Sequence, residues 1–592
     1  MVMVNDTSVR SGMLRVIPLL GFAALLLSID GCAAGTTARP PRYDMVIRGG
    51  TVYDGTGAPG VLADIAIEAD TIAAIGTLPP GSGAREFSAA GLAVAPGFIN
   101  MLSWANVSLI YDGRSQGGIR QGVTLEVMGE GSSMGPLTDS MKAEALAREG
   151  DIKYDIPWTT LGEYLEFLEK KGISTNVASF IGAGTVRVHE VGYANRPATP
   201  AELARMQELV RQAMREGALG VGSSLIYAPD NYAPTDELIA LAKAAGEYHG
   251  MYISHMRDEG AHVLEALDEL IHIADAAHVP AEIYHLKTSG RANWGKLDTI
   301  IGRVDSARRA GLQITADMYT YPASSTGLDA TMPTWVQEGG FKEWKRRLAD
   351  PAIRARLVRE MRGGAEGYDN SFANSGGPDG ILLVSFRQDS LRYLIGKTLG
   401  QVARMRGTSP EETAMDLVIQ DDSRVGCVFF TMSEENVRKK IAVPWVSFGS
   451  DAGSYATEGV FLKSGTHPRA YGNVARLLGK YVRDEQVIPL AEAIRKLTSL
   501  PASNLKLDRR GRLAPGYYAD VVVFDPATIM DHATFERPHQ YSTGVRDVFV
   551  NGVQVLRDGE HTGATPGRFV RGPGWSNGHQ SSVDSRRLTT DD

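Results

Sequence analysis

Two short stretches, Tyr252-Ile253-Ser254-His255 and Ala281-Glu282-Ile283-Tyr284-His285, decide the fold. Each is a brief apolar run that ends on a histidine, and a helical pattern from Val263 to Ala277 lies between them. The two histidines are about 30 residues apart, the length of one strand-plus-helix repeat in a parallel barrel. Because the strand ends of such a barrel open into one mouth, we expect both imidazoles to lie there.

The same alternation of strand and helix continues on both sides, from about Ala95 to Ser499. It predicts an α/β protein built on a (β/α)8 TIM-like barrel. One helix is expected at 201–210, because Thr199-Pro200 is a good start signal. Further strands are expected at 124–128, 312–316 and 446–448, and they end at or near the acidic residues Glu130, Asp317 and Asp451.

Short strands with glycine turns occur near both ends of this region, at 45–50 and 64–67 and again at 519–525 and 548–552. We expect them to pack together as one small β-sandwich beside the barrel. The predicted organisation is an export signal (1–32), a tether (33–43), the first part of the sandwich (44–95), the barrel (96–500) with an insertion near 330–400, the second part of the sandwich (501–574) and a polar tail (575–592).

The composition of the 592 residues is that of a globular protein, with 43% hydrophobic and 22% charged residues. The formal net charge of -8 leaves no basic excess, so we expect no nucleic-acid partner. The sequence leaves the oligomeric state open. Only 2 cysteines occur, Cys32 and Cys427, and lipidation of Cys32 would leave Cys427 without a disulfide partner. Metal rather than disulfides is then expected to provide any cross-linking.

The N-terminus resembles an export signal. Arg10 and Arg15 precede an apolar run, 16–27, that is short for a membrane span. The run leads to Cys32, as in bacterial lipoprotein signals. We therefore expect export to the periplasm or cell envelope, with lipidation of Cys32 favoured over ordinary cleavage near Ala33-Ala34 or a retained anchor.

The polar residues at the strand ends are the types that bind zinc. Imidazole nitrogen and carboxylate oxygen are both common zinc ligands. One histidine at a strand end is more often structural. Two of them, His255 and His285, with the carboxylates Glu130 and Asp451 at equivalent positions, favour a metal centre instead.

Several blocks resemble the D-aminoacylase branch of the amidohydrolase superfamily. The segment 249–260 (HGMYISHMRDEG) is similar to the fifth-strand motif of that branch. The resemblance extends from about Asp44 to Gly574. Later blocks that carry it are 283–295 (IYHLKTSGRANWG), 316–327 (ADMYTYPASSTG), 448–454 (FGSDAGS), 467–472 (HPRAYG) and 513–526 (LAPGYYADVVVFDP).

The resemblance implies a barrel with a β-sandwich, zinc, and hydrolysis of an amide on a D-amino acid. Carried over by position, His255 and His285 are zinc ligands and Asp451 is the proton-transferring carboxylate. Arg469 would bind the substrate carboxylate, since a guanidinium fork suits that group. The residues at pocket positions of the family are Lys287, Tyr227, Tyr319 and Ser325.

The sequence departs from the family in two places. Leu102 and Trp104 stand where the superfamily has a His-x-His pair, and neither side chain can ligate a cation. Glu130 stands where the branch often has a cysteine, and a carboxylate is a competent zinc ligand. We therefore expect one zinc per chain, held by Glu130, His255 and His285, rather than an inactive barrel that serves as a binding protein or scaffold.

Three functions remain open at this point. The favoured one is a zinc-dependent N-acyl-D-amino-acid deacylase acting on a small-molecule substrate. A related amidohydrolase could act on dipeptides or cyclic amides, and a cyclic imide would not need Arg469. The third is a catalytically silent envelope lipoprotein of the same fold.

Overall fold

The computed structural model describes residues 42–364 and 367–576. The export segment with Arg10, Arg15 and Cys32 lies outside the described residues. None of the helices in these two ranges combines the length and the apolar composition of a transmembrane span.

Eight parallel strands in the described part of the chain form the barrel. Its ring closes where the amide of Met101, just after the first strand, donates a 3.1 Å hydrogen bond to the carbonyl of Phe448 in the last. The strands, in order around the ring, are β6 (Phe98–Asn100), β7 (Val123–Met128), β8 (Asn176–Ser179) continued by β9 (Ile181–Gly182), β10 (Gly220–Ser224), β11 (Met251–His255), β12 (Ala281–Ile283), β13 (Ile314–Met318) and β17 (Val446–Phe448).

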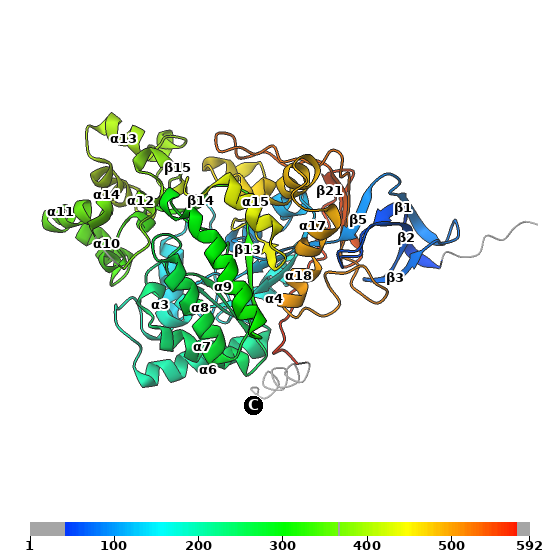
Figure 1. Ribbon diagram of the computed structural model, residues 1–592, viewed down its shortest axis with the longest axis horizontal. Coiled ribbons are helices and arrows are strands. Elements are labelled where there is room, and N and C mark those ends of the chain that lie inside the picture. Colours follow the sequence, from blue (N-terminus) through cyan, green and yellow to red (C-terminus); the bar gives the residue numbers. More distant parts are fainter. Residues whose placement is uncertain (1–41, 365–366, 577–592) are drawn as a thin grey trace, which may run out of the picture. The chain divides into compact units, whose positions relative to one another are not determined.

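Amphipathic helices surround these strands, and α6 to α9 pack side by side in chain order (Figure 1). The helix predicted at 201–210 is α6, which is longer because Thr199 and Glu202 form a capping box at its start and Gly217 ends it in a left-handed conformation. The barrel-region helices are α1 (Asn106–Tyr111), α2 (Gln116–Ile119), α3 (Asp139–Ala147), α4 (Leu161–Lys171), α5 (Ala183–Glu190), α6 (Pro200–Glu216), α7 (Thr235–Gly246), α8 (Val263–Ala277), α9 (Leu297–Arg309), α15 (Glu434–Ala442), α16 (Arg469–Arg476), α17 (Leu490–Leu497) and α18 (Ser499–Asn504).

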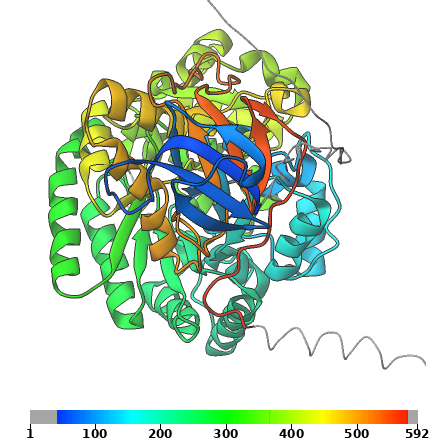
Figure 2. The same ribbon diagram turned by 90° about the vertical axis from the view of Figure 1, so that its right-hand side faces the viewer.

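Strands from both ends of the described chain form one β domain (Figure 2). Antiparallel pairing of Val94 with Val523 joins the two sets. Phe87 on β4 contacts Phe549 on β19 with ring centroids 6.1 Å apart, although these strands are not neighbours, so the sheet folds over onto itself. The strands are β1 (Tyr43–Val52), β2 (Val61–Glu68), β3 (Thr71–Gly76), β4 (Gly83–Ser88), β5 (Ala93–Pro96), β18 (Val521–Phe524), β19 (Val545–Val550), β20 (Val553–Arg557) and β21 (Glu560–His561).

A segment with its own hydrophobic core lies between β13 and β17. Leu328, Trp344 and Phe429 are among the buried side chains of this core. The segment contacts the barrel at Asp369, whose carboxylate accepts a 3.0 Å hydrogen bond from the amide of Glu259. Its elements are β14 (Ser324–Gly327), α10 (Phe341–Leu348), α11 (Pro351–Arg359), α12 (Ser371–Asn374), β15 (Ile381–Ser385), α13 (Leu399–Arg406), α14 (Pro410–Asp421) and β16 (Gly426–Phe429).

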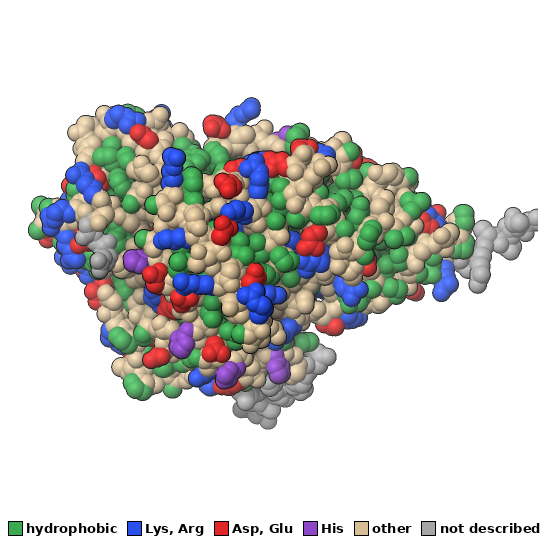
Figure 3. Space-filling model, viewed as in Figure 1, with side chains coloured by type: hydrophobic (Ala, Val, Ile, Leu, Met, Phe, Trp, Pro, Cys, Tyr) green, Lys and Arg blue, Asp and Glu red, His purple; other side chains and the backbone are tan. Residues whose placement is uncertain are grey.

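Charged side chains of both signs are interspersed over the face drawn in Figure 3. Ion pairs link neighbouring helices of the barrel, such as Lys439 of α15 with Asp298 of α9 at 3.0 Å. Exposed pairs of this kind contribute only about 0–1 kcal/mol each. The fold therefore depends on the apolar core beneath them.

Candidate metal centre

Three strand ends bring together the side chains predicted to bind metal. Glu130 follows β7 after one glycine, Gly129, which has a φ of 106° and leaves no room for a Cβ because one would lie 2.3 Å from the carbonyl oxygen of Phe180. His255 is the last residue of β11. His285 lies two residues beyond β12 and has a φ of 35°, which is uncommon outside glycine.

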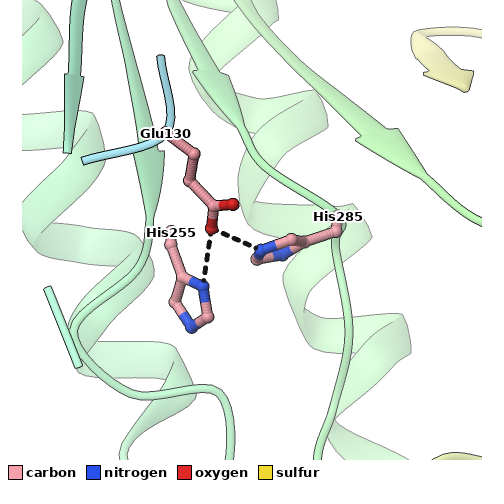
Figure 4. Close-up of side chains that lie close together, drawn as sticks. All are labelled: Glu130, His255 and His285. Atoms are coloured by element: carbon pink, nitrogen blue, oxygen red, sulfur yellow. Dashed lines mark hydrogen bonds and ion pairs between the residues drawn. The ribbon is translucent and has the colours of Figure 1, made fainter. Parts of the chain in front are cut away.

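The side chains of both histidines point at one oxygen of Glu130 (Figure 4). Its Oε1 lies 3.0 Å from Nδ1 of His255 and 2.9 Å from Nε2 of His285. All three residues are buried, and one ligand atom from each lies within 4.8 Å of the others. Among residues 42–364 and 367–576, this is the one such group that could hold a metal ion.

The charges at this site suit a divalent cation. Burial alone would raise the pKa of Glu130, but His285 and His255 outweigh burial and hold that pKa well below its usual range. Burial works against the charged form of His255, yet the carboxylates of Glu259 and Glu130 raise its pKa to about 9. The ionised carboxylate of Glu130 is thus stabilised by positive charge beside it. Two imidazole nitrogens and a carboxylate oxygen are a donor set that zinc accepts, with a fourth position left for a reactant.

The remaining ring nitrogens of the two histidines face Glu259 and Lys287. Oε2 of Glu259 lies 3.4 Å from Nε2 of His255, and Oε1 accepts a 2.8 Å hydrogen bond from Lys287. Nζ of Lys287 in turn lies 2.6 Å from Nδ1 of His285. Partners of this kind fix the orientation of metal-binding imidazoles.

Asp451 lies beside the three candidate ligands. It follows β17, adopts a φ of 50°, and its amide donates a 2.9 Å hydrogen bond to the carbonyl of Leu102. Burial and the charge of Glu130 raise the pKa of Asp451, while Arg469 acts to lower it. A carboxylate whose pKa is raised toward neutrality is suited to accepting and returning a proton.

A cavity of about 750 Å³ opens over these residues. Its lining includes Lys287, Tyr227, Ser325 and Arg469, four of the five residues predicted to contact substrate. The hydroxyls of Tyr227 and Ser325 already donate 2.8 Å hydrogen bonds within the protein, to Thr326 Oγ1 and the Cys427 carbonyl. Tyr319 lies behind the lining, with its ring 4.4 Å from the guanidinium of Arg469.

The sequence patterns do not predict two features of the site. One is Glu259, although an acidic residue four positions after a strand-end histidine is a signal for a partner of that histidine. The other is Trp104, which the sequence marks only as a lost ligand position but whose Nε1 donates hydrogen bonds to Glu130 and Asp451. Asp317, predicted at a strand end, is buried within β13, where it accepts a 3.0 Å hydrogen bond from the amide of His285.

A parallel barrel with two histidines and two carboxylates at its strand ends defines a metal-dependent hydrolase of the amidohydrolase class. Residues 85–556 match the family described as "Amidohydrolase family". D-aminoacylase of Alcaligenes xylosoxydans xylosoxydans is 31% identical over 532 residues, which cover 89% of this chain and 97% of that protein. The chain belongs to the amidohydrolase family, in its D-aminoacylase branch.

Solved structures agree with this placement. A D-aminoacylase structure, described in terms of a binuclear metal centre with one-metal activation and second-metal attenuation, superposes with a TM-score of 0.74 at 32% identity and covers 89% of this chain and all of its own. N-acyl-D-glutamate deacylase of Bordetella bronchiseptica, complexed with zinc and a phosphonate inhibitor that mimics the tetrahedral intermediate, gives 0.75 at 28% identity, covering 90% of this chain and 100% of that chain.

Proposed function

We propose that this chain hydrolyses the amide of N-acyl-D-amino acids and releases a carboxylic acid and a D-amino acid. The observation that carries the proposal is the approach of His255 Nδ1 and His285 Nε2 to the single oxygen Oε1 of Glu130. These three residues would hold one zinc ion. Zinc at such a site polarises a carbonyl and lowers the pKa of water to about 7.

Arg469 supports a substrate with a free carboxylate. Its guanidinium is buried, and Nη1 forms a 2.9 Å ion pair with Oδ2 of Asp451, but in the described part of the chain Nε has no hydrogen-bond acceptor. A buried donor left unpaired is costly, so an arriving carboxylate that accepts from it is favoured. Lys287, Tyr227 and Ser325 would line the same pocket, with Tyr319 supporting Arg469 from behind.

Asp451 would move the proton. Water provides the oxygen of the released acid, and Asp451 takes one of its protons as the carbon–oxygen bond forms. Asp451 then gives that proton to the nitrogen as the carbon–nitrogen bond breaks, so that the amine leaves neutral. Arg469 holds the amino-acid carboxylate throughout and thereby keeps the scissile amide near Asp451.

The D configuration of the substrate is proposed from the relatives, which are named for D-amino-acid derivatives. The test is amine release by the zinc-loaded full chain from N-acetyl-D-leucine, N-acetyl-D-glutamate, their L enantiomers, a D-dipeptide and dihydrouracil. We expect turnover of an N-acyl-D substrate at least tenfold faster than its L form. Faster turnover of dihydrouracil would favour the cyclic-amide alternative, and no zinc with no turnover would favour the silent lipoprotein.

We further propose that the protein works outside the cytoplasm, in the periplasm or cell envelope. The support is the sequence alone: Arg10 and Arg15, the apolar run 16–27, and Cys32 as a lipidation site. Detergent partitioning and mass analysis of the mature N-terminus in a bacterial host would test lipidation, which a Cys32→Ser variant should abolish.

A further inference from the structure

The indole of Trp104 lies between the two carboxylates of the proposed centre. Its Nε1 is 3.0 Å from Oε2 of Glu130 and 3.1 Å from Oδ1 of Asp451. A single N–H group thus bridges the proposed zinc ligand and the proposed proton carrier. Trp104 lines the cavity and is 39% exposed as a residue, so the bridge is formed at the surface where substrate would arrive.

Within each carboxylate, the two oxygens have different partners, and the indole is the partner that the two carboxylates share. Oε1 of Glu130 faces the two histidines, and its Oε2 faces the indole. Oδ2 of Asp451 lies 2.9 Å from Nη1 of Arg469, and its Oδ1 faces the indole. Glu130 therefore presents one oxygen to the proposed metal, and Asp451 is held at a fixed distance from it.

The backbone fixes the indole relative to the loop that carries Asp451. The amide of Trp104 donates a 3.0 Å hydrogen bond to the carbonyl of Ala452, the residue next to Asp451. Ser103 forms a parallel bridge with the same Ala452, and its amide donates to Val127 in β7, the strand before Glu130. The segment 103–104 is thus tied to both strand ends whose carboxylates the indole contacts.

We propose that Trp104 takes the place of a second cation. Two carboxylates that contact the same N–H group, one of them buried, repel each other unless a positive charge or a donor lies between them. The indole N–H is a donor that cannot accept, and the two oxygens share its one hydrogen in a three-centre hydrogen bond. A cation that bound Oε2 of Glu130 and Oδ1 of Asp451 would have to displace it. Trp104 is therefore a positioning residue: it keeps the centre mononuclear and holds the carboxylate of Asp451 in place. This inference rests on the proposed function.

The test removes the N–H and keeps the ring, in Trp104→Phe. We expect zinc affinity, measured by competition with a chelator, to fall about 10- to 100-fold, the size of effect seen when partners of metal ligands are lost. At saturating zinc, kcat should fall at least tenfold while KM stays within about threefold of the wild-type value, because Asp451 loses the donor that holds its carboxylate in position. Trp335→Phe is the matched control, since its indole also donates to a carboxylate, Glu360, at 2.8 Å, away from this cavity.

Wild-type zinc affinity and kcat in Trp104→Phe would overturn the proposal, as would equal losses in Trp335→Phe.

Zinc titration gives a second test that does not depend on measuring turnover. Wild type should bind one ion per chain, and Leu102→His/Trp104→His should bind two; a second tight ion in wild type overturns the inference even if the variants do not fold. If wild type binds one zinc but cleaves no N-acyl-D-amino acid, the proposed function fails while the titration still decides the role of Trp104.

Discussion

Nη1 of Arg469 lies 2.9 Å from Oδ2 of Asp451, so the residue proposed to bind the substrate carboxylate contacts the residue proposed to move the proton. Arg469 acts to lower the pKa of Asp451, against burial and Glu130, which raise it. A substrate carboxylate that engages the guanidinium would weaken its hold on Asp451. Binding and proton transfer are thereby linked through one side chain.

Replacing Asp451 by asparagine should remove turnover without removing zinc. The amide cannot take a proton, and loss of a general base lowers rates by about 10² to 10⁴. The three proposed ligands are unchanged, so zinc per chain should stay at the wild-type value. Steady-state kinetics with metal analysis of the same sample measures both, and unchanged kcat would remove Asp451 from the mechanism.

Arg469→Lys should weaken binding of substrates that carry a free carboxylate. Lysine keeps the charge but loses the planar fork. We expect KM for an N-acyl-D-amino acid to rise at least tenfold, with a much smaller change for the corresponding amide that lacks the carboxylate. Equal effects on the acid and its amide would show that Arg469 acts only through Asp451.

Glu259→Gln should weaken metal binding although Glu259 is not among the proposed ligands. The carboxylate of Glu259 lies 3.4 Å from His255 and accepts a hydrogen bond from Lys287. The glutamine variant lacks the negative charge of this carboxylate. We expect zinc affinity to fall about 10- to 100-fold. Chelator competition measures this, with Glu269→Gln as the control, since Glu269 pairs with Arg257 rather than with the two histidines. A variant with wild-type affinity would leave Glu259 a purely structural role.

The barrel was predictable because its signal is local. The strand predicted at 446–448 is β17, and the helix predicted at 263–277 is α8. Both were predictable because apolar runs and helical periodicity involve only residues that are close together in the sequence. The strand predicted at 312–316 is shifted, to Ile314–Met318, which buries Asp317 within the strand. Strand ends depend on pairing with distant neighbours, which single-sequence patterns do not report.

The site was less predictable where contacts cross the barrel. Glu130, His255 and His285 each follow a recognisable strand, so their meeting was expected from topology. The hydrogen bond from Trp104 to Asp451 joins residues 347 positions apart. No pattern near Trp104 indicates it, and only the closed ring places β6 and β17 side by side.

Stability should depend on pH through Asp230, which lies outside the proposed chemistry. Burial raises the pKa of Asp230 to about 7, so the folded protein favours the protonated acid. The stabilisation is complete below the unfolded pKa near 3.8 and is lost as pH rises towards 7. Between pH 5 and pH 8, wild type should lose about 2 to 3 kcal/mol of unfolding free energy that Asp230→Asn does not.

Urea unfolding at the two pH values measures the effect, and Asp236→Asn is the control because Asp236 is exposed. If wild type and Asp230→Asn show the same pH dependence, Asp230 is ionised in the folded protein at neutral pH.

Metal analysis of the full chain and of Glu130→Gln tests the central claim most directly. After removal of loosely bound metal, the wild type should retain one zinc per chain, and Glu130→Gln should retain almost none, because its amide lacks the charge on which both histidines converge. Two zinc ions in the wild type, none at all, or a full complement in Glu130→Gln would contradict a single site built on Glu130, His255 and His285.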